Sequence, residues 1–177
     1  MSREQALVHA VGWLLGPAWI RRMRRRHRLG RRPLTEAELE RLGRYFSPEL
    51  LARVRVVEVR RIELWGSGRV RSIAARRGGR VATRPAGLTL DDLVLVIDNA
   101  ADRGSLLFHE LVHVAQFARL GRRGFAARYL TEWWNAGRDV GRIDMERDAY
   151  ELQARFEHGE AFSVEAEVAR RLGGRGG

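Results

Sequence analysis

His109, Glu110 and His113 form a His-Glu-x-x-His pattern, in which residue type and spacing together indicate chemistry. On a helix, positions four apart lie about 40° apart around the axis and about 6 Å apart along it, so the two histidines can direct their imidazoles at one ion. Glu110 lies about 100° round from His109, where it can hold a metal-bound water but cannot serve as the second ligand. The spacing therefore predicts a zinc site that carries its own general base.

The residues around this motif predict that its helix is buried. Between Leu106 and Ala118 the polar residues are His109, Glu110, His113 and Gln116, and a helix that is apolar nearly all round belongs in a core. A buried polar group without a partner costs about 1 to 3 kcal/mol, so two imidazoles and a carboxylate need a shared partner. A metal ion would be that partner, whereas the alternative is a pair of core histidines satisfied by neighbouring side chains.

A third ligand is expected from the acidic segment 144–151. The chain has no cysteine, so a zinc site must use histidine and carboxylate ligands. We select Glu146 as the third ligand and keep Glu151 and Asp148 as alternatives. With the fourth position left to water, two histidines and one carboxylate form a catalytic type of zinc site.

The motif HELVH at 109–113, followed by MERDAYE at 145–151, resembles the zincin-type metallopeptidases that use a glutamate as third ligand. It is most similar to small bacterial families of predicted metallopeptidases of unknown substrate, in which HELxHVxQ precedes an E-x-[DE]-A segment. The likeness covers about residues 93–156. It implies a zinc-dependent hydrolase of peptide bonds, with His109, His113 and Glu146 as ligands and Glu110 as the base.

The sequence departs from the thermolysin-like pattern at Tyr150. Those enzymes carry an aspartate four residues after the ligand glutamate, and it orients a histidine. Either other residues orient the ligands here, or the third ligand is another acid. Tyr150 lies one turn from Glu146, so its hydroxyl is a candidate donor to the oxyanion that develops during hydrolysis.

The remaining chain predicts an α+β fold that is mostly helical, with a small sheet and the His-Glu-x-x-His helix at its centre. The resemblance implies that this fold is zincin-like. Strands are expected within 53–62 and at 93–97, and helices are expected from Thr35, from Ser47 and over 125–135 and 143–172. We expect breaks at Gly121 and Gly124 and near Gly159, with Ser163 as a new helix cap. Strand 93–97 could offer an edge to an extended peptide, or it could be a plain core strand. The stretch with Gly66, Gly68, Gly78 and Gly79 predicts a loop or irregular hairpin.

We divide the 177 residues into an appended segment 1–32, a single zincin-like domain 33–172 and a flexible glycine-rich tail 173–177. The formal net charge is +11. Without the eight arginines between 21 and 32, 25 basic residues face 22 acidic ones, which leaves +3. These eight are Arg21, Arg22, Arg24, Arg25, Arg26, Arg28, Arg31 and Arg32. The charge is therefore local, and the composition gives little support to nucleic-acid binding.

Residues 6–20 are mostly apolar, but they are too few to span a membrane and they precede the arginines, unlike a signal peptide. Segment 1–32 therefore predicts either docking at an anionic membrane surface or a helix packed on the core, of which we favour the second. We expect a cytoplasmic protein, peripheral at the membrane if segment 1–32 docks there, that acts on a peptide or protein substrate. The alternatives are a non-catalytic zinc-stabilised scaffold, and a membrane-surface or nucleic-acid adaptor acting through Arg21–Arg32.

Overall fold

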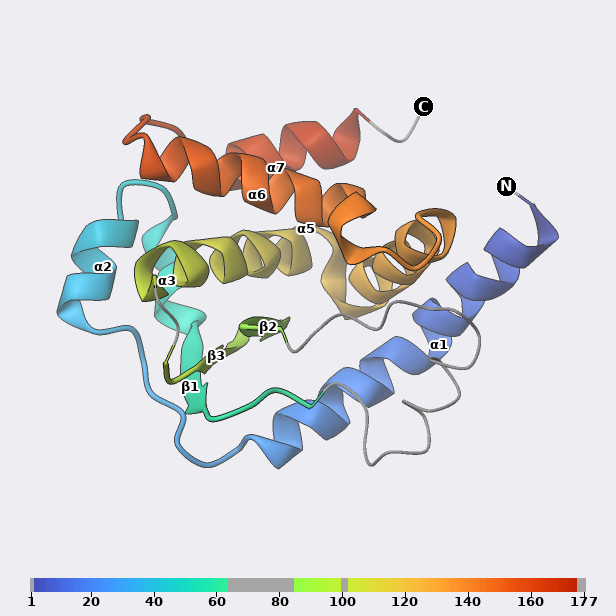
Figure 1. The fold of residues 1–177 in the computed structure, drawn as a ribbon, viewed down its shortest axis with the longest axis horizontal. Coiled ribbons are helices and arrows are strands. Elements are labelled where there is room, and N and C mark those ends of the chain that lie inside the picture. The colour runs from blue at the N-terminus through green and yellow to red at the C-terminus, as the bar shows by residue number, and fades with distance from the viewer. Residues whose placement is uncertain (1, 64–84, 100–101, 175–177) are drawn as a thin grey trace.

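The computed structural model describes residues 2–63, 85–99 and 102–174 (Figure 1). The elements are α1 (Arg3–Arg26), α2 (Glu36–Leu42), α3 (Pro48–Arg53), β1 (Arg55–Val59), β2 (Gly87–Leu90), β3 (Leu93–Ile97), α5 (Arg103–Asn135), the 3-10 helix η1 (Val140–Arg142), α6 (Asp144–Glu157) and α7 (Val164–Gly173). The chain is therefore mostly helical with a small sheet, as an α+β fold requires.

The short helices begin where their capping residues predict. The Thr35 hydroxyl accepts the backbone N–H of Glu38 at 3.2 Å, and the Glu38 carboxylate accepts the backbone N–H of Thr35 at 2.7 Å. The Ser47 hydroxyl caps α3, whose first residue is Pro48. Each cap satisfies backbone donors that the first helical turn leaves unpaired. The starts of α2 and α3 are thus confirmed.

The three strands form a sheet in the order β1-β3-β2. β3 pairs in parallel with β1 and antiparallel with β2, and Leu90 lies opposite Leu93 across a two-residue turn. The expectation that strand 93–97 offers a free edge is therefore wrong, because both of its edges are paired. The outer strand beside α5 is β2, which was not predicted from the sequence.

Strand β3 is buried on both faces, which explains its uninterrupted apolar run. Val94 and Val96 join the cluster that contains Phe108 of α5, whereas Leu93 and Leu95 join the cluster that contains Ile20 and Met23 of α1. In Figure 1 the sheet lies beside the first half of α5, and α6 and α7 lie on the other side of that helix. The motif-bearing part of α5 is thereby enclosed.

Helix α5 changes direction at Gly121, whose backbone is non-helical at φ 66° and ψ 168°. A positive φ is easily adopted by glycine and is strained for most other residues. The change of direction separates an inner half with the two histidines from an outer half that runs against α1. The break expected near Gly121 is confirmed, and so is the break at Gly159, where φ is 71°.

Helix α1 packs closely on the outer half of α5 through two small residues. A Cβ atom added to Gly12 would lie 2.6 Å from Ala127 Cα, and one added to Gly16 would lie 2.3 Å from Ala126 Cβ. Ile20 and Met23 of α1 are also buried. Segment 1–32, which we expected as an appended part, thus contributes side chains to the core.

Gly12→Ala is expected to destabilise the protein by about 1 to 3 kcal/mol, because the new methyl group would meet the backbone of α5 rather than a side chain that can move. Gly173→Ala is the matched control, since a Cβ atom there has nothing within 4 Å. Alanine in a helix should leave stability unchanged or raise it slightly. Urea unfolding of both variants measures the difference, and equal midpoints would contradict the close packing of α1 on α5.

Among the described residues, no helix combines the length and hydropathy needed to cross a membrane. The predicted loop with Gly66, Gly68, Gly78 and Gly79 lies outside the described residues, as does most of the predicted tail.

Candidate metal centre

The structure brings His109, His113 and Glu146 together as a buried group that could hold a metal ion. Glu146 Oε2 lies 3.4 Å from His109 Nε2 and 3.6 Å from His113 Nε2. The histidines come from the inner half of α5 and the glutamate from the first turn of α6. All three residues are at most 8% exposed, so any charge that they carry is poorly solvated and needs a partner.

The two N–O distances fit a tetrahedral metal site better than they fit hydrogen bonds. Hydrogen bonds between nitrogen and oxygen are usually about 2.7 to 3.2 Å long. Around zinc, ligand bonds of about 2.1 Å at tetrahedral angles place neighbouring donor atoms about 3.4 Å apart. The separations of Glu146 Oε2 from His109 Nε2 and His113 Nε2 lie close to that value.

Two glutamine side chains orient the histidines. Gln153 Oε1 accepts His109 Nδ1–H at 3.1 Å, and Gln116 Oε1 accepts His113 Nδ1–H at 2.8 Å. The amides are themselves oriented, since Gln116 Nε2 donates to Met145 O and Gln153 Nε2 donates to Glu157. Because an amide oxygen can only accept, the proton of each neutral imidazole is on Nδ1 and the free lone pair is on Nε2. Both lone pairs therefore belong to the nitrogens nearest Glu146, as metal ligation requires.

Tyr129 orients the third ligand, because its hydroxyl donates to Glu146 Oε1 at 2.8 Å. Burial and the charge of Glu146 raise the pKa of Tyr129 far above its usual value, so this phenol remains a donor. The bond occupies Oε1 and leaves Oε2 for the two histidines. Tyr129 comes from the outer half of α5, which reaches Glu146 because the helix turns at Gly121.

Tyr129→Phe is expected to weaken metal binding by about 10- to 100-fold, the usual effect of removing a hydrogen bond to a ligand. The ring itself should still stack on Phe125, whose centroid is 5.8 Å away. Tyr45→Phe removes a hydroxyl that bonds to no described residue and serves as the control. Competition with a chromophoric chelator measures both dissociation constants, and equal values would show that Tyr129 does not orient the ligand.

The electrostatics of the metal-free group couple His113 to Glu146. Burial alone would lower the pKa of His113, but the charges of Glu146 and Glu110 more than offset burial and raise it to about 9. Burial works against the ionised form of Glu146 too, yet the two histidines lower its pKa well below its usual range. Without metal, a proton on His113 therefore balances the carboxylate, and a metal ion would take the place of that proton.

Metal uptake is expected to release about one proton per chain at neutral pH, because ligation requires neutral His113. The folded pKa of about 9 is above the ordinary 6.5. The protonated pair therefore stabilises the metal-free protein fully below pH 6.5 and loses that effect as the pH rises through 9. The apparent affinity for a metal ion should rise about tenfold per pH unit up to that point. Calorimetry in buffers of different ionisation enthalpy counts the proton, and pH-independent binding would exclude this coupling.

Glu110 lies on the same buried helix but faces strand β2. The Thr89 hydroxyl is 2.7 Å from Glu110 Oε2 and 2.9 Å from Glu110 O, and it can donate to one of them at a time. A Cβ atom at Gly87 would lie only 2.1 Å from Glu110 Oε1. Burial raises the pKa of Glu110, while the neighbouring histidines lower it in part. Strand β2 therefore confines this carboxylate. The Thr89 hydroxyl lies within hydrogen-bonding distance of it, and the absence of a side chain at Gly87 leaves the space that it occupies.

The other acids considered as ligands form a different cluster. Asp148 Oδ1 accepts a hydrogen bond from Arg171 of α7 at 3.0 Å, and Glu151 pairs with the same guanidinium. The structure therefore places Glu146, and neither of these two, beside the histidines. Tyr150 is 57% exposed and its ring centroid lies 4.5 Å from that of His109.

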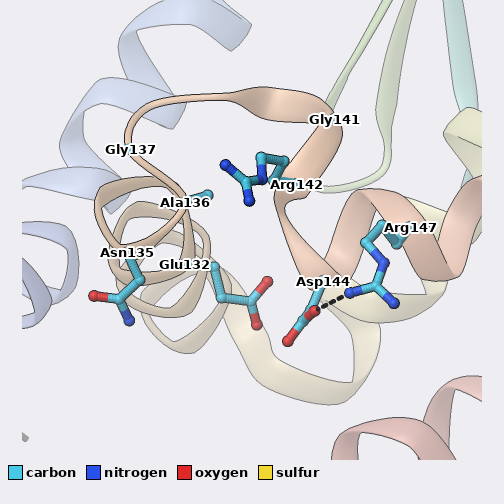
Figure 2. A pocket seen from close by; sticks show the side chains of 8 residues that line it. All are labelled: Glu132, Asn135, Ala136, Gly137, Gly141, Arg142, Asp144 and Arg147. Carbon is cyan, nitrogen blue, oxygen red and sulfur yellow. Dashed lines mark hydrogen bonds and ion pairs between the residues drawn. The ribbon is translucent and has the colours of Figure 1, made fainter.

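A surface pocket lies close in sequence to the metal group but is distinct from it. Figure 2 shows the pocket between the end of α5 and the start of α6; its lining residues are Glu132, Asn135, Ala136, Gly137, Gly141, Arg142, Asp144 and Arg147. Glu132 Oε2 accepts the backbone N–H of Met145 at 2.9 Å, and Glu132 Oε1 accepts Arg128 Nε–H at 2.8 Å. Glu132 thereby fixes the first turn of α6, which carries Glu146.

Four residues that support the site were not predicted from the sequence: Tyr129, Gln153, Thr89 and Gly87. For Gln153 a signal existed, because Glu146, Tyr150 and Gln153 recur at the helical spacing that relates His109, His113 and Gln116. Thr89 and Gly87 lie on an unrecognised four-residue strand. Tyr129 lies in an aromatic segment that predicts packing, and it packs there as well.

No known family model, curated protein or solved structure matches this chain.

Proposed function

We propose that the protein is a zinc-dependent peptidase, in which His109, His113 and Glu146 bind the metal. The observation that carries the proposal is the approach of Glu146 Oε2 to both Nε2 atoms, at 3.4 and 3.6 Å, inside the core. Two imidazoles and one carboxylate suit zinc, and three protein ligands leave one position open as in catalytic zinc sites. A bound zinc ion would supply Lewis acidity and lower the pKa of water toward about 7.

Glu110 is the proposed general base. It would take the proton from the attacking water and deliver it to the amine that leaves when the peptide bond breaks. Its burial supports this role, because a raised pKa brings a carboxyl group closer to the pH at which proton transfer in both directions is efficient. Thr89 and Gly87 restrict the positions that the carboxylate can take.

Strand β2 is the proposed site for the substrate backbone. It is an outer strand of the described sheet, and its residues Gly87 and Thr89 contact Glu110. An extended peptide could pair with the outer edge of β2 and receive main-chain hydrogen bonds there. Strand β2 replaces β3 as the candidate edge, and a peptide bound there would lie next to the proposed base.

Tyr150 is the proposed second donor to the oxyanion. Its ring lies beside His109, and its exposure leaves the hydroxyl accessible to a substrate. Burial of part of the side chain and the charges of Glu146 and Glu110 raise the pKa of Tyr150, so the hydroxyl keeps its proton at neutral pH and can donate it in a hydrogen bond.

The test combines metal analysis with a search for cleavage. The purified chain should contain about one zinc ion, cleave members of a diverse peptide library, lose cleavage on chelation and regain it on zinc addition. Bound zinc that raises the melting temperature without any cleavage would favour the scaffold alternative. Cleavage that survives complete removal of metal would overturn the proposal.

A further inference from the structure

Helix α1 exposes an apolar surface that its packing on α5 does not explain. Leu7, Leu14 and Leu15 are 66%, 66% and 63% exposed, and Val11 is 43% exposed. These four residues recur at i, i+4, i+7 and i+8, so they lie on one face of the helix. The opposite face carries the buried residues that join α1 to the core. Figure 1 shows α1 at the outside of the molecule. A face of this kind usually marks an interaction site.

The same face becomes basic toward the end of the helix. Continuing the spacing from Leu7 gives Arg21, Arg22 and Arg25, and all three are exposed. They form no ion pair with any residue that the structure describes. Arg24 points elsewhere, because it pairs with Asp92 of the sheet turn. We define the α1 face as Leu7, Val11, Leu14, Leu15, Arg21, Arg22 and Arg25.

Among the described residues, no acid pairs with the arginines of the α1 face. The only acid of α1 is Glu4 in its first turn, about 25 Å along the axis from Arg21, and Glu63 pairs with the neighbouring Arg26. About 27 Å of helix therefore presents leucine and valine followed by uncompensated arginine. A surface that is apolar at one end and cationic at the other complements a boundary where hydrocarbon meets anionic groups.

We propose that the α1 face docks the protein on an anionic lipid surface. Leu7, Leu14 and Leu15 would enter the boundary between headgroups and acyl chains, while Arg21, Arg22 and Arg25 would extend to lipid phosphates. No described helix has the length and hydropathy to cross a membrane. In this proposal α1 would therefore lie along the lipid surface. Gly12, Ile20 and Met23 hold the helix to the core and keep this face outward.

The observations favour lipid over other occupants. If two copies met through this face with parallel helices, Arg21 and Arg25 would face the same residues of the second copy and repel them. With antiparallel helices, the arginines would lie against leucines and lose water without gaining a partner. Nucleic acid would account for the arginines but would leave the four apolar residues exposed. An anionic bilayer accounts for both ends.

The test is flotation of the full chain with vesicles of phosphatidylcholine, either alone or mixed with phosphatidylglycerol. Binding is expected to the mixed vesicles and to weaken as salt increases. Replacing Arg21, Arg22 and Arg25 by Gln should lower the partition coefficient about 100-fold, since each arginine contributes about a factor of five. Replacing Leu7, Leu14 and Leu15 by Gln should lower it about tenfold or more.

The control replaces Arg44, Arg53 and Arg123 by Gln, which removes the same charge from exposed positions outside the α1 face. It should bind nearly as the unchanged protein does. Equal loss in the control would show a general charge effect and overturn the proposal. Binding that ignores the leucine replacements, or equal binding to neutral vesicles, would overturn it too. Circular dichroism checks that each variant folds, as expected for exposed positions.

A tryptophan in place of Leu14 provides a direct reporter, since position 14 belongs to the α1 face. Brominated lipids should quench the fluorescence of Leu14→Trp more strongly than that of the unchanged protein in the bound state. Equal quenching of the two proteins would place the lipid on another surface. A dimer in solution that the leucine replacements dissolve would identify a second copy as the occupant. Neither readout requires peptidase activity, so each is independent of the proposed function.

Discussion

Glu110→Gln is expected to bind zinc as the unchanged protein does and to hydrolyse peptides about 10² to 10⁴ times more slowly. Glutamine keeps the shape of the side chain, and its amide oxygen can still accept the hydrogen bond from Thr89. It cannot take a proton from water at neutral pH. Because burial raises the pKa of Glu110, the ionised carboxylate reduces stability above its ordinary pKa. The metal-free variant should therefore be at least as stable at neutral pH.

The measurement compares kcat/KM, zinc content and unfolding midpoint in the same preparations. Glu151→Gln is the matched control, because it makes the same change to an exposed glutamate that pairs with Arg171. Its rate should stay close to that of the unchanged protein. Activity of Glu110→Gln within a few-fold of normal, with zinc in place, would remove Glu110 from the role of base. A variant that lost zinc as well would instead point to a structural role for this carboxylate.

Glu146→Gln is expected to lower zinc affinity by about 10² to 10³-fold, the share of one ligand in a typical site. The amide is a poorer ligand than a carboxylate, and the change removes the charge that raises the pKa of His113. Without that charge the pKa of His113 should fall in the metal-free variant. The proton released on zinc binding near neutral pH should therefore largely disappear, which separates loss of the ligand from general damage.

Isothermal titration gives the affinity and the proton count, and the zinc-dependent rise in melting temperature gives an independent check. The same Glu151→Gln variant is the control, and it should bind zinc normally. One zinc per chain with an unchanged dissociation constant in Glu146→Gln would exclude Glu146 from the metal site. Asp148 is not expected to replace Glu146 as a ligand, because its carboxylate accepts a hydrogen bond from Arg171.

The local signals of the sequence predicted the helices and the central strand well. Caps at Thr35, Ser47 and Ser163 fix helix starts through hydrogen bonds within three residues, and the apolar run 93–97 can be satisfied only by burial on both faces. Such features depend on neighbours in the chain. The same applies to His109 and His113, which one helical turn brings together.

What the sequence could not predict depends on contacts between distant segments. Strand β2 has only four residues, and its importance lies in the approach of Gly87 and Thr89 to Glu110, more than twenty positions later. The hydrogen bond from Tyr129 to Glu146 requires the change of direction at Gly121, which sequence periodicity marks as a break without giving its angle. Glu146 was selected from the sequence, but the exclusion of Asp148 and Glu151 depended on the position of Arg171 on α7.

The turn at Gly121 also limits how the length of this chain can change. Tyr129 lies eight residues after Gly121, and each residue inserted between them would rotate the phenol by about 100° around the helix axis. The histidines before the turn would keep their places, but Glu146 would lose its donor. Any relative that uses the same metal group should therefore conserve this interval, whereas exposed loops such as the one after α6 can vary in length. The interval between positions 121 and 129 would therefore identify relatives with this metal group better than residue identity does.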